Sequence, residues 1–321
     1  IDLPLDYYLG FVRPHAYGLS HQHLSKWLVD HVTALGVDML MGVAVVWVPF
    51  WLIRRFPRRW WLITAVLTVP FLFFMALVKP VWFDPLFNDF GPMKDRALER
   101  RIVALAHRAG IDGSRIYEVN KSVDTDTVNA YVTGFLGTRR IVLWDTLLAK
   151  LDDREVLVVM GHEMGHYALN HVVRSLLLLS LLNLVGLYVV HRLAGWILAR
   201  WPERLRLSAL SDIASLPLFV LLLNAAAFVS MPLVCAYSRH QEHEADRFAL
   251  EITHMNHSGA EAFVKLQRDN LSVPRPGWFY TLWRATHPSI GDRIDFCNTY
   301  HPWRTGQQSE YEDLVHIDGS P

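Results

Sequence analysis

The chain has 321 residues, equal numbers of acidic and basic side chains, and a hydrophobic content of 52%, which is high for a soluble protein. It shows no basic stripe with interleaved aromatic residues, so nucleic acid is not an expected partner. The two cysteines, Cys235 and Cys297, provide neither a metal-binding pair nor a disulfide framework.

Residues 1–34 combine prolines, glycines and aromatic residues with four histidines, namely His15, His21, His23 and His31. Their spacings fit no helical ligand pair with a carboxylate, which argues against a metal site here. This segment is therefore predicted to be a loop and an amphipathic helix at a membrane surface.

Four apolar segments are long enough to be membrane helices. They are residues 39–53, 60–78, 175–199 and 213–237. The first of them is short and needs residues 35–38 to complete a membrane crossing. Each alone could be a buried core helix, but four such segments in one chain favour membrane spans. The basic turn at residues 54–59 is typical of a headgroup region. The predicted fold is mainly α, a multi-span helical membrane protein with a further folded domain.

Between the second and third spans, the sequence resembles an ordinary folded domain. Residues 94–109 have helical periodicity, and Gly110 ends the predicted helix. Three short runs follow, at residues 115–119, 129–135 and 139–144, with glycines at positions 134 and 137 that suggest a hairpin. We expect a small antiparallel sheet. Its edge either accepts an extended peptide as an added strand or has no substrate role, and the pattern leaves both alternatives open.

The next helix is predicted to carry the motif His162-Glu163-x-x-His166. Asp152 and Glu155 have the spacing of a capping box, so the helix is expected to begin near Asp153 and to continue into the following span. On a helix the two imidazoles lie one turn apart on one face, with Glu163 beside them. This arrangement is typical of a zinc hydrolase, and the alternative is a pair of core histidines four residues apart.

The motif lacks a third metal ligand nearby. The longer zincin pattern needs a glycine at position 169 and a histidine at position 172, but these positions hold Leu169 and Val172. No acidic residue occurs between His171 and Glu203. The chain must therefore cross the membrane and return before it can supply a carboxylate ligand.

The returning segment, residues 238–250, offers several metal-binding side chains. On a helix, one stripe contains Glu242, Ala245, Asp246, Ala249 and Leu250, whereas Glu244 is expected to point elsewhere together with Arg247 and Phe248. Glu242 is thus the preferred third ligand, and Asp246 could accept the outer N–H of a ligand histidine. The remaining alternatives for the third ligand are His240, His243 and Glu244.

Together these features resemble the type I CAAX prenyl protease family of integral-membrane zinc metalloproteases. The resemblance covers nearly the whole chain. It rests on His162-Glu163-Met164-Gly165-His166, Glu242-x-x-Ala245-Asp246, Asn129-Ala130-Tyr131, His287-Pro288 with Arg293, Pro85-Leu86-Phe87-Asn88 and Arg140-Ile141-Val142-Leu143.

The resemblance implies a gluzincin fold within a helical barrel that encloses a water-filled intramembrane chamber. It also implies roles for ten side chains. One zinc ion would be bound by His162, His166 and Glu242. Glu163 would activate water, and Asp246 would support the ligands from behind. His287 and Arg293 would face the substrate carbonyl and stabilise the oxyanion, while Asn129, Ala130 and Tyr131 would form the edge strand that aligns the peptide.

The implied activity is cleavage of peptide bonds near the carboxy terminus of prenylated CAAX proteins or of similar membrane-associated peptides. Two alternatives remain: a heat-shock-type quality-control metalloprotease, and a non-enzymatic membrane protein with structural zinc. The family has seven spans, whereas four are found here. The short Arg-rich connection and the compact tail resemble bacterial members, so we expect a bacterial inner membrane, or the endoplasmic reticulum membrane in a eukaryote.

The chain is thus predicted to contain four parts. They are the surface segment with spans 1 and 2 (residues 1–78), the first part of the zincin domain (79–173), the membrane hairpin with spans 3 and 4 (174–237), and the second part of the zincin domain (238–321).

Overall fold

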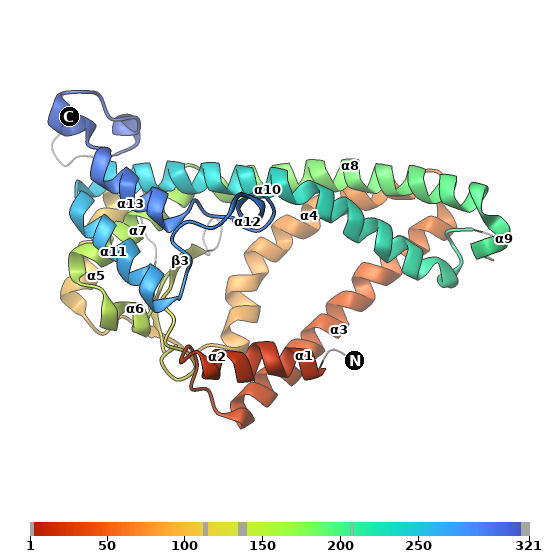
Figure 1. Ribbon diagram of the computed structural model, residues 1–321, viewed down its shortest axis with the longest axis horizontal. Helices are drawn as coiled ribbons and strands as arrows, with labels where there is room; N and C mark the ends of the chain where they lie inside the picture. Colours follow the sequence, from red (N-terminus) through yellow and green to blue (C-terminus); the bar gives the residue numbers. More distant parts are fainter. Residues whose placement is uncertain (1–2, 112–114, 134–139, 206, 208, 316–321) are drawn as a thin grey trace. The chain divides into compact units, whose positions relative to one another are not determined.

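The computed structural model describes residues 3–111, 115–133, 140–205, 207 and 209–315 (Figure 1). The chain forms two compact units. Unit 1 draws on Ile1–Asp30, Leu77–Val172 and Cys235–Pro321, and unit 2 on His31–Ala76 and Val173–Val234. Each unit is therefore assembled from segments that are far apart in the sequence. The four-part division given above stays a prediction.

Unit 2 is built from long apolar helices. Among the described residues, four segments are long and apolar enough to cross a membrane, namely Leu24–Arg55, Trp60–Leu86, His171–Arg200 and Ile213–Thr253. They correspond to helices α3 (Leu24–Arg55), α4 (Trp60–Val78), α8 (His171–Arg200) and α10 (Leu216–Thr253). Within the unit, Trp60 is buried and its Nε1 donates a hydrogen bond to Nδ1 of His191 at 3.1 Å. The four predicted spans are confirmed, with longer bounds.

Unit 1 contains a four-stranded sheet in the order β1-β2-β4-β3. Its strands are β1 (Phe90–Pro92), β2 (Arg115–Val119), β3 (Ala130–Thr133) and β4 (Arg140–Trp144). The β1–β2 and β3–β4 pairs are antiparallel, but β2 and β4 run parallel. The prediction of an antiparallel sheet is wrong, because β4 of the returning hairpin, not β3, pairs with β2. The glycines at positions 134 and 137, which suggested the hairpin turn, lie outside the described residues.

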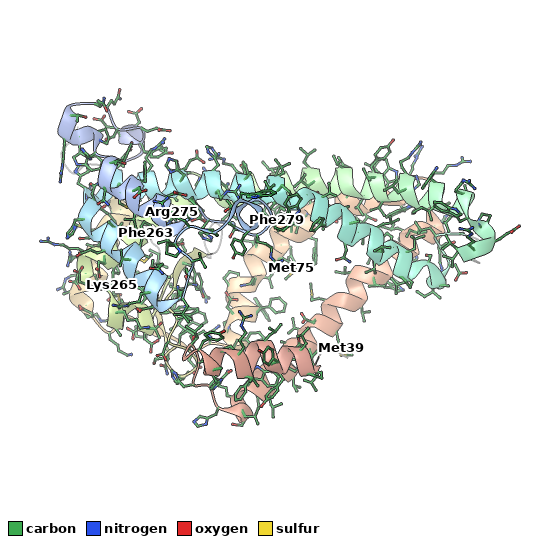
Figure 2. All side chains as sticks on the ribbon, in the orientation of Figure 1. Met39, Met75, Phe263, Lys265, Arg275 and Phe279 are labelled. Carbon is green, nitrogen blue, oxygen red and sulfur yellow. The ribbon has the colours of Figure 1, made fainter. Side chains whose placement is uncertain are left out.

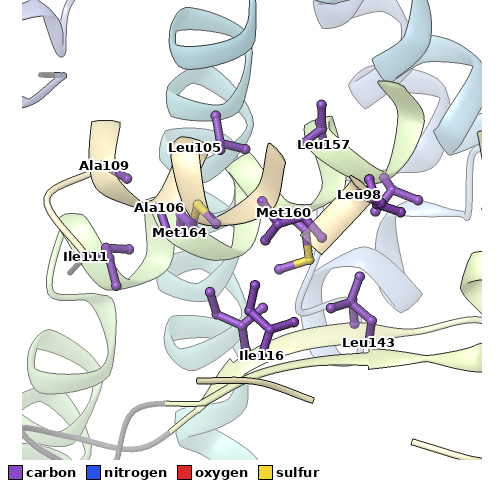
Figure 3. Packing of buried hydrophobic residues seen from close by; sticks show 14 of the residues in the cluster. Leu98, Leu105, Ala106, Ala109, Ile111, Ile116, Leu143, Leu157, Met160 and Met164 are labelled. Carbon is purple, nitrogen blue, oxygen red and sulfur yellow. The ribbon is translucent and has the colours of Figure 1, made fainter. Parts of the chain in front are cut away.

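Helices α5 (Arg96–Arg108), α6 (Asp145–Lys150) and α7 (Asp153–Ala168) share a hydrophobic core with the sheet (Figure 3). Met160 and Met164 on α7 are fully buried, and Ile116 and Leu143 of the sheet belong to the same cluster. Helix α5 ends as predicted, because Gly110 adopts a left-handed φ of 68°. This core holds α7 at a fixed position over the sheet.

The predicted capping box of α7 is confirmed. The Asp152 side chain accepts hydrogen bonds from the helix start, while the Glu155 carboxylate accepts one from the backbone N–H of Asp152 at 2.7 Å. The buried Glu155 carboxylate also accepts a hydrogen bond from Lys265 Nζ on α11 (Asn256–Asp269) at 2.7 Å. Lys265 is labelled in Figure 2. The start of α7 is thereby linked to a helix that follows about 100 residues later.

Helix α7 does not continue into the next span as expected. It ends at Ala168, Asn170 adopts a left-handed φ of 55°, and α8 begins at His171. Asparagine tolerates this conformation better than most residues, so the sequence allows a sharp break here.

The remaining elements of the two units are short. Helix α13 (Ile290–Thr299) packs side by side with α11 (Figure 1). The amino-terminal segment, predicted as a loop and a helix, contains the short helical elements α1, η1 and α2 before α3. The elements not yet bounded are α1 (Leu3–Tyr7), η1 (Tyr8–Val12), α2 (Arg13–Ala16), η2 (Lys79–Phe83), η3 (Asp84–Leu86), α9 (Pro202–Leu205), η5 (Ile213–Ser215), α12 (Trp278–Trp283), α14 (Pro302–Thr305) and η6 (Glu312–Leu314).

Candidate active site

Three metal-binding side chains converge in unit 1, two from α7 and one from α10. Nε2 of His166 lies 3.2 Å from Nε2 of His162. Glu242 places Oε2 at 3.3 Å from His162 Nε2 and Oε1 at 3.4 Å from His166 Nε2. Among the described residues, these three form a group that could hold a metal ion. The structure thus brings the three predicted ligands together, although their role as ligands stays a prediction.

The spacing of the two histidine nitrogens fits a tetrahedral zinc ion. Nitrogen and oxygen ligands bind zinc at about 2.0–2.2 Å, so two ligands of a tetrahedral site lie about 3.3–3.5 Å apart. The two Nε2 atoms are 3.2 Å apart, and each lies close to a different oxygen of Glu242. One ligand atom from each of the three residues lies within 4.8 Å of the others. The donor set of two imidazoles and one carboxylate is also one that catalytic zinc sites use.

Small residues allow α7 and α10 to approach closely. A Cβ atom added to Gly165 would lie 3.2 Å from Ala245 Cα and 3.1 Å from Phe248 Cβ, and one added to Gly161 would lie 3.3 Å from Ala249 Cα. Ala245 and Ala249 of the predicted stripe thus lie against the two glycines of α7. The expectation that Phe248 points elsewhere is wrong, because α10 also buries this ring against α7.

Replacing Gly165 by alanine is expected to lower the stability of the fold by about 1–3 kcal/mol, because the added methyl group has backbone neighbours that cannot move aside. Thermal unfolding of the purified protein in detergent measures this loss. A suitable control is Gly195→Ala on α8, where an added Cβ meets nothing within 4 Å. Equal melting temperatures for both variants would contradict the role of close helix packing.

Asp246 orients His162 from behind. Its Oδ1 lies 2.8 Å from His162 Nδ1, so the outer N–H of the imidazole has the predicted carboxylate acceptor. Asp246 also accepts two hydrogen bonds from Arg293, from Nε at 2.8 Å and from Nη2 at 2.6 Å. The Arg293 guanidinium is 8% exposed and lies 4.1 Å from the centre of the Phe263 ring. In this structure Arg293 therefore holds Asp246, and its predicted contact with a substrate carbonyl stays a prediction.

The electrostatics of the group favour a positive charge. Burial lowers the pKa of His162, but hydrogen bonds to Asp246 and Glu242 outweigh this effect and raise the pKa to about 10. The carboxylates therefore stabilise a cation at this imidazole, whether a proton or a metal ion. Burial also raises the pKa of the Glu163 carboxyl, and the two imidazoles oppose that shift. A raised pKa makes a carboxylate a stronger base toward a nearby water.

A cavity of about 870 Å³ opens beside the group and lies within unit 1. Its wall includes Glu163, Asn129 and Ala130 at the start of β3, and His287. Nε2 of His287 lies 3.3 Å from Glu242 Oε1. Most predicted site residues therefore share one cavity, whose wall also includes His162, Asp246 and Arg293. Tyr131, His166 and Glu242 are not part of this wall. Burial raises the pKa of the Tyr131 hydroxyl to about 12, so it keeps its proton at neutral pH.

The alternative third ligands lie elsewhere on α10. Glu244 Oε2 is 3.4 Å from Nε2 of His171 and 3.6 Å from Nε2 of His240. The His243 ring packs against Phe296, with 4.4 Å between ring centroids. None of the three belongs to the metal-binding group found among the described residues. The contact between His171 and His166 was not predicted from the sequence. The asparagine directly before His171, a residue that often ends a helix, was a usable signal.

Comparisons with known proteins agree with the fold and the site. Residues 92–300 match the model of Peptidase family M48, and residues 1–89 match that of the CAAX prenyl protease N-terminal region, described as five membrane helices. The chain is 40% identical over 294 residues to an uncharacterized metalloprotease, YhfN, of Bacillus subtilis, an alignment that covers 92% of this chain and 69% of that protein. It is 27% identical over 315 residues to CAAX prenyl protease 1 of Saccharomyces cerevisiae, with coverages of 92% and 68%.

Among solved structures, the crystal structure of S. mikatae Ste24p matches with a TM-score of 0.78 and 26% identity, covering 92% of this chain and 71% of that one. The apolar helices, the metal-binding group and these matches define an integral-membrane metalloprotease. The chain belongs to peptidase family M48.

Proposed function

We propose that the protein is a zinc metalloendopeptidase that cleaves peptide bonds near the carboxy terminus of prenylated CAAX proteins or of similar membrane-associated peptides. The observation that carries the proposal is the convergence of His162, His166 and Glu242 beside a cavity whose wall includes His162 and Glu163. The substrate class is supported by relatives that are named CAAX prenyl protease 1.

In this mechanism, His162, His166 and Glu242 would hold a zinc ion, which when bound would act as a Lewis acid toward water and the scissile carbonyl. Glu163 takes a proton from the attacking water and then donates it to the leaving amine. The backbone N–H of Val132 in β3 stabilises the charged form of the Glu163 carboxylate. The base is therefore held between the metal-binding group and the edge strand.

The substrate peptide is proposed to bind along β3. This strand is the last in the sheet order and pairs on one side with β4, and none of the described strands pairs with its other edge, where a peptide could add as a further strand. Asn129 and Ala130 line the cavity, so a peptide on this edge would pass the Glu163 carboxylate. His287, whose side chain is 58% exposed, is placed to donate a hydrogen bond to the carbonyl oxygen as negative charge develops. The positive charge of Arg293 would add to the stabilisation of the negative charge on this oxygen.

Two parts of the chain are proposed to make up the protease domain, residues 79–173 and 238–321. The intervening hairpin, residues 174–237, anchors both parts in the bilayer and brings Glu242 back to the motif on α7. Residues 1–78 contribute the remaining described spans.

The proposal is tested with the purified full chain and two peptides of the same CAAX sequence, one farnesylated and one unmodified. We expect cleavage of the farnesylated peptide that a zinc chelator abolishes and added zinc restores, with less cleavage of the unmodified peptide. Cleavage that resists the chelator would contradict the zinc mechanism. Equal cleavage of both peptides would instead favour a quality-control protease of broader specificity.

A non-enzymatic protein with structural zinc would cleave neither peptide. Structural zinc sites use four protein ligands, whereas the group found among the described residues supplies three. That difference favours the enzyme.

A further inference from the structure

His171 contacts the proposed zinc ligand His166 on the side away from Glu242. Nδ1 of His166 and Nδ1 of His171 are 2.8 Å apart, and the two rings meet edge to face with centroids 5.0 Å apart. The His171 side chain is 3% exposed. A histidine buried this deeply and bonded to a ligand is well placed to control that ligand.

The chemistry of the two rings gives this hydrogen bond a direction. When Nε2 of His166 binds a metal ion, the neutral imidazole carries its proton on Nδ1 and must donate it. Nδ1 of His171 then accepts, so His171 carries its own proton on Nε2. That nitrogen lies 3.4 Å from Oε2 of Glu244.

Local structure places His171 at this position. The left-handed conformation of Asn170 ends α7 and turns the chain, so that the ring of His171 returns to the back of His166. Nε2 of Gln241 donates a hydrogen bond to the backbone carbonyl of His171 at 3.2 Å. Helix α10 therefore holds this residue by two side chains, Gln241 at the backbone and Glu244 at the ring.

The contact between His171 and His166 matches the contact between Asp246 and the other proposed ligand, His162. Asp246 accepts the outer N–H of His162, and His171 would accept the outer N–H of His166. Glu242 and Glu244 are two residues apart on α10, which rotates them by about 200° around the helix axis. One carboxylate can thus face the metal-binding group directly while the other acts through His171.

We infer that His171 and Glu244 are positioning residues that fix the tautomer and ring orientation of His166 and so raise the affinity of the site for zinc. The inference rests on the proposed function, because it takes His166 as a zinc ligand. Removing an outer hydrogen-bond partner of a ligand typically lowers metal affinity about 10- to 100-fold.

The experiment measures the zinc dissociation constant of the full chain in detergent by competition with a chelator. His171→Leu is expected to weaken zinc binding about 10- to 100-fold, and Glu244→Ala by about 10-fold. His171→Asn should recover part of the loss, because its amide oxygen can accept the proton of His166 Nδ1. Glu244→Gln should likewise be milder than Glu244→Ala. His257→Leu on α11, where the side chain is 85% exposed, is the matched control and should bind zinc normally.

Nitrogen NMR of the zinc-loaded protein labelled at histidine provides a second readout. His171 is expected to carry its proton on Nε2. A proton on Nδ1 would overturn the proposed hydrogen bond from His166 to His171. This measurement needs no variant, so it decides the question even if His171→Leu fails to fold.

The outcomes separate this inference from the proposed function. If His171→Leu and Glu244→Ala both bind zinc as tightly as the wild type while Glu242→Ala loses zinc, the positioning role is overturned and the zinc site stands. If Glu242→Ala retains zinc, the proposed ligand set is wrong and the inference falls with it.

Discussion

Glu163→Gln is expected to retain zinc and to lose peptidase activity, with kcat/KM lower by about 100- to 10,000-fold. The amide has nearly the shape of the carboxylate but cannot take a proton from water. Because Glu163 lines the cavity without belonging to the metal-binding group, its replacement should leave that group in place. Elemental analysis for zinc and a peptide cleavage assay on the same preparation measure both quantities.

The matched control for this variant is Glu261→Gln on α11, where the side chain is 50% exposed. It changes the same functional group outside the site and should leave kcat/KM unchanged. Substantial turnover by Glu163→Gln, in a preparation shown to be free of other proteases, would mean that another group accepts the proton.

Glu242→Ala is expected to lose both zinc and activity, because it removes one of three ligands from the group. Its zinc affinity should fall by more than the about 10- to 100-fold typical of an outer hydrogen-bond partner. Glu244→Ala should still reach one zinc per chain when zinc is in excess, although with weaker affinity. Metal content after equilibration with zinc measures the difference. Zinc bound by Glu242→Ala but not by Glu244→Ala would show that Glu244 is the ligand.

The local features of the site could be predicted from short stretches of sequence. The capping box of Asp152 and Glu155 and the spacing of His162 and His166 act within one or two helical turns, so neighbouring residues determine them. The lack of an acidic residue after His171 also predicted that the third ligand lies beyond a membrane hairpin. Helix periodicity then favoured Glu242 over Glu244, and the structure places Glu242 beside both histidines.

Features that depend on pairing between distant segments were predicted less well. The prediction of an antiparallel sheet was wrong, because alternation along β2 or β4 does not say which neighbour each strand will have. Phe248 was expected to point away from α7, because the width of the buried face of α10 depends on how closely α7 approaches at Gly165. The hydrogen bonds between Arg293 and Asp246 were not predicted, and the contact of Arg293 with a substrate stays a prediction.

By itself the sequence determined that this protein has four apolar spans and a metal-binding helix that needs a carboxylate from the far side of a hairpin. Hydrophobic length and helical spacing are local properties, which is why they can be read directly from the chain. Only the tertiary structure decided that Asp246 contacts His162 rather than His166, that His171 contacts His166, and that Arg293 and Glu244 lie next to Asp246 and His171, respectively. Such contacts depend on side-chain directions at the crossing of α7 and α10, and packing between the two helices sets those directions.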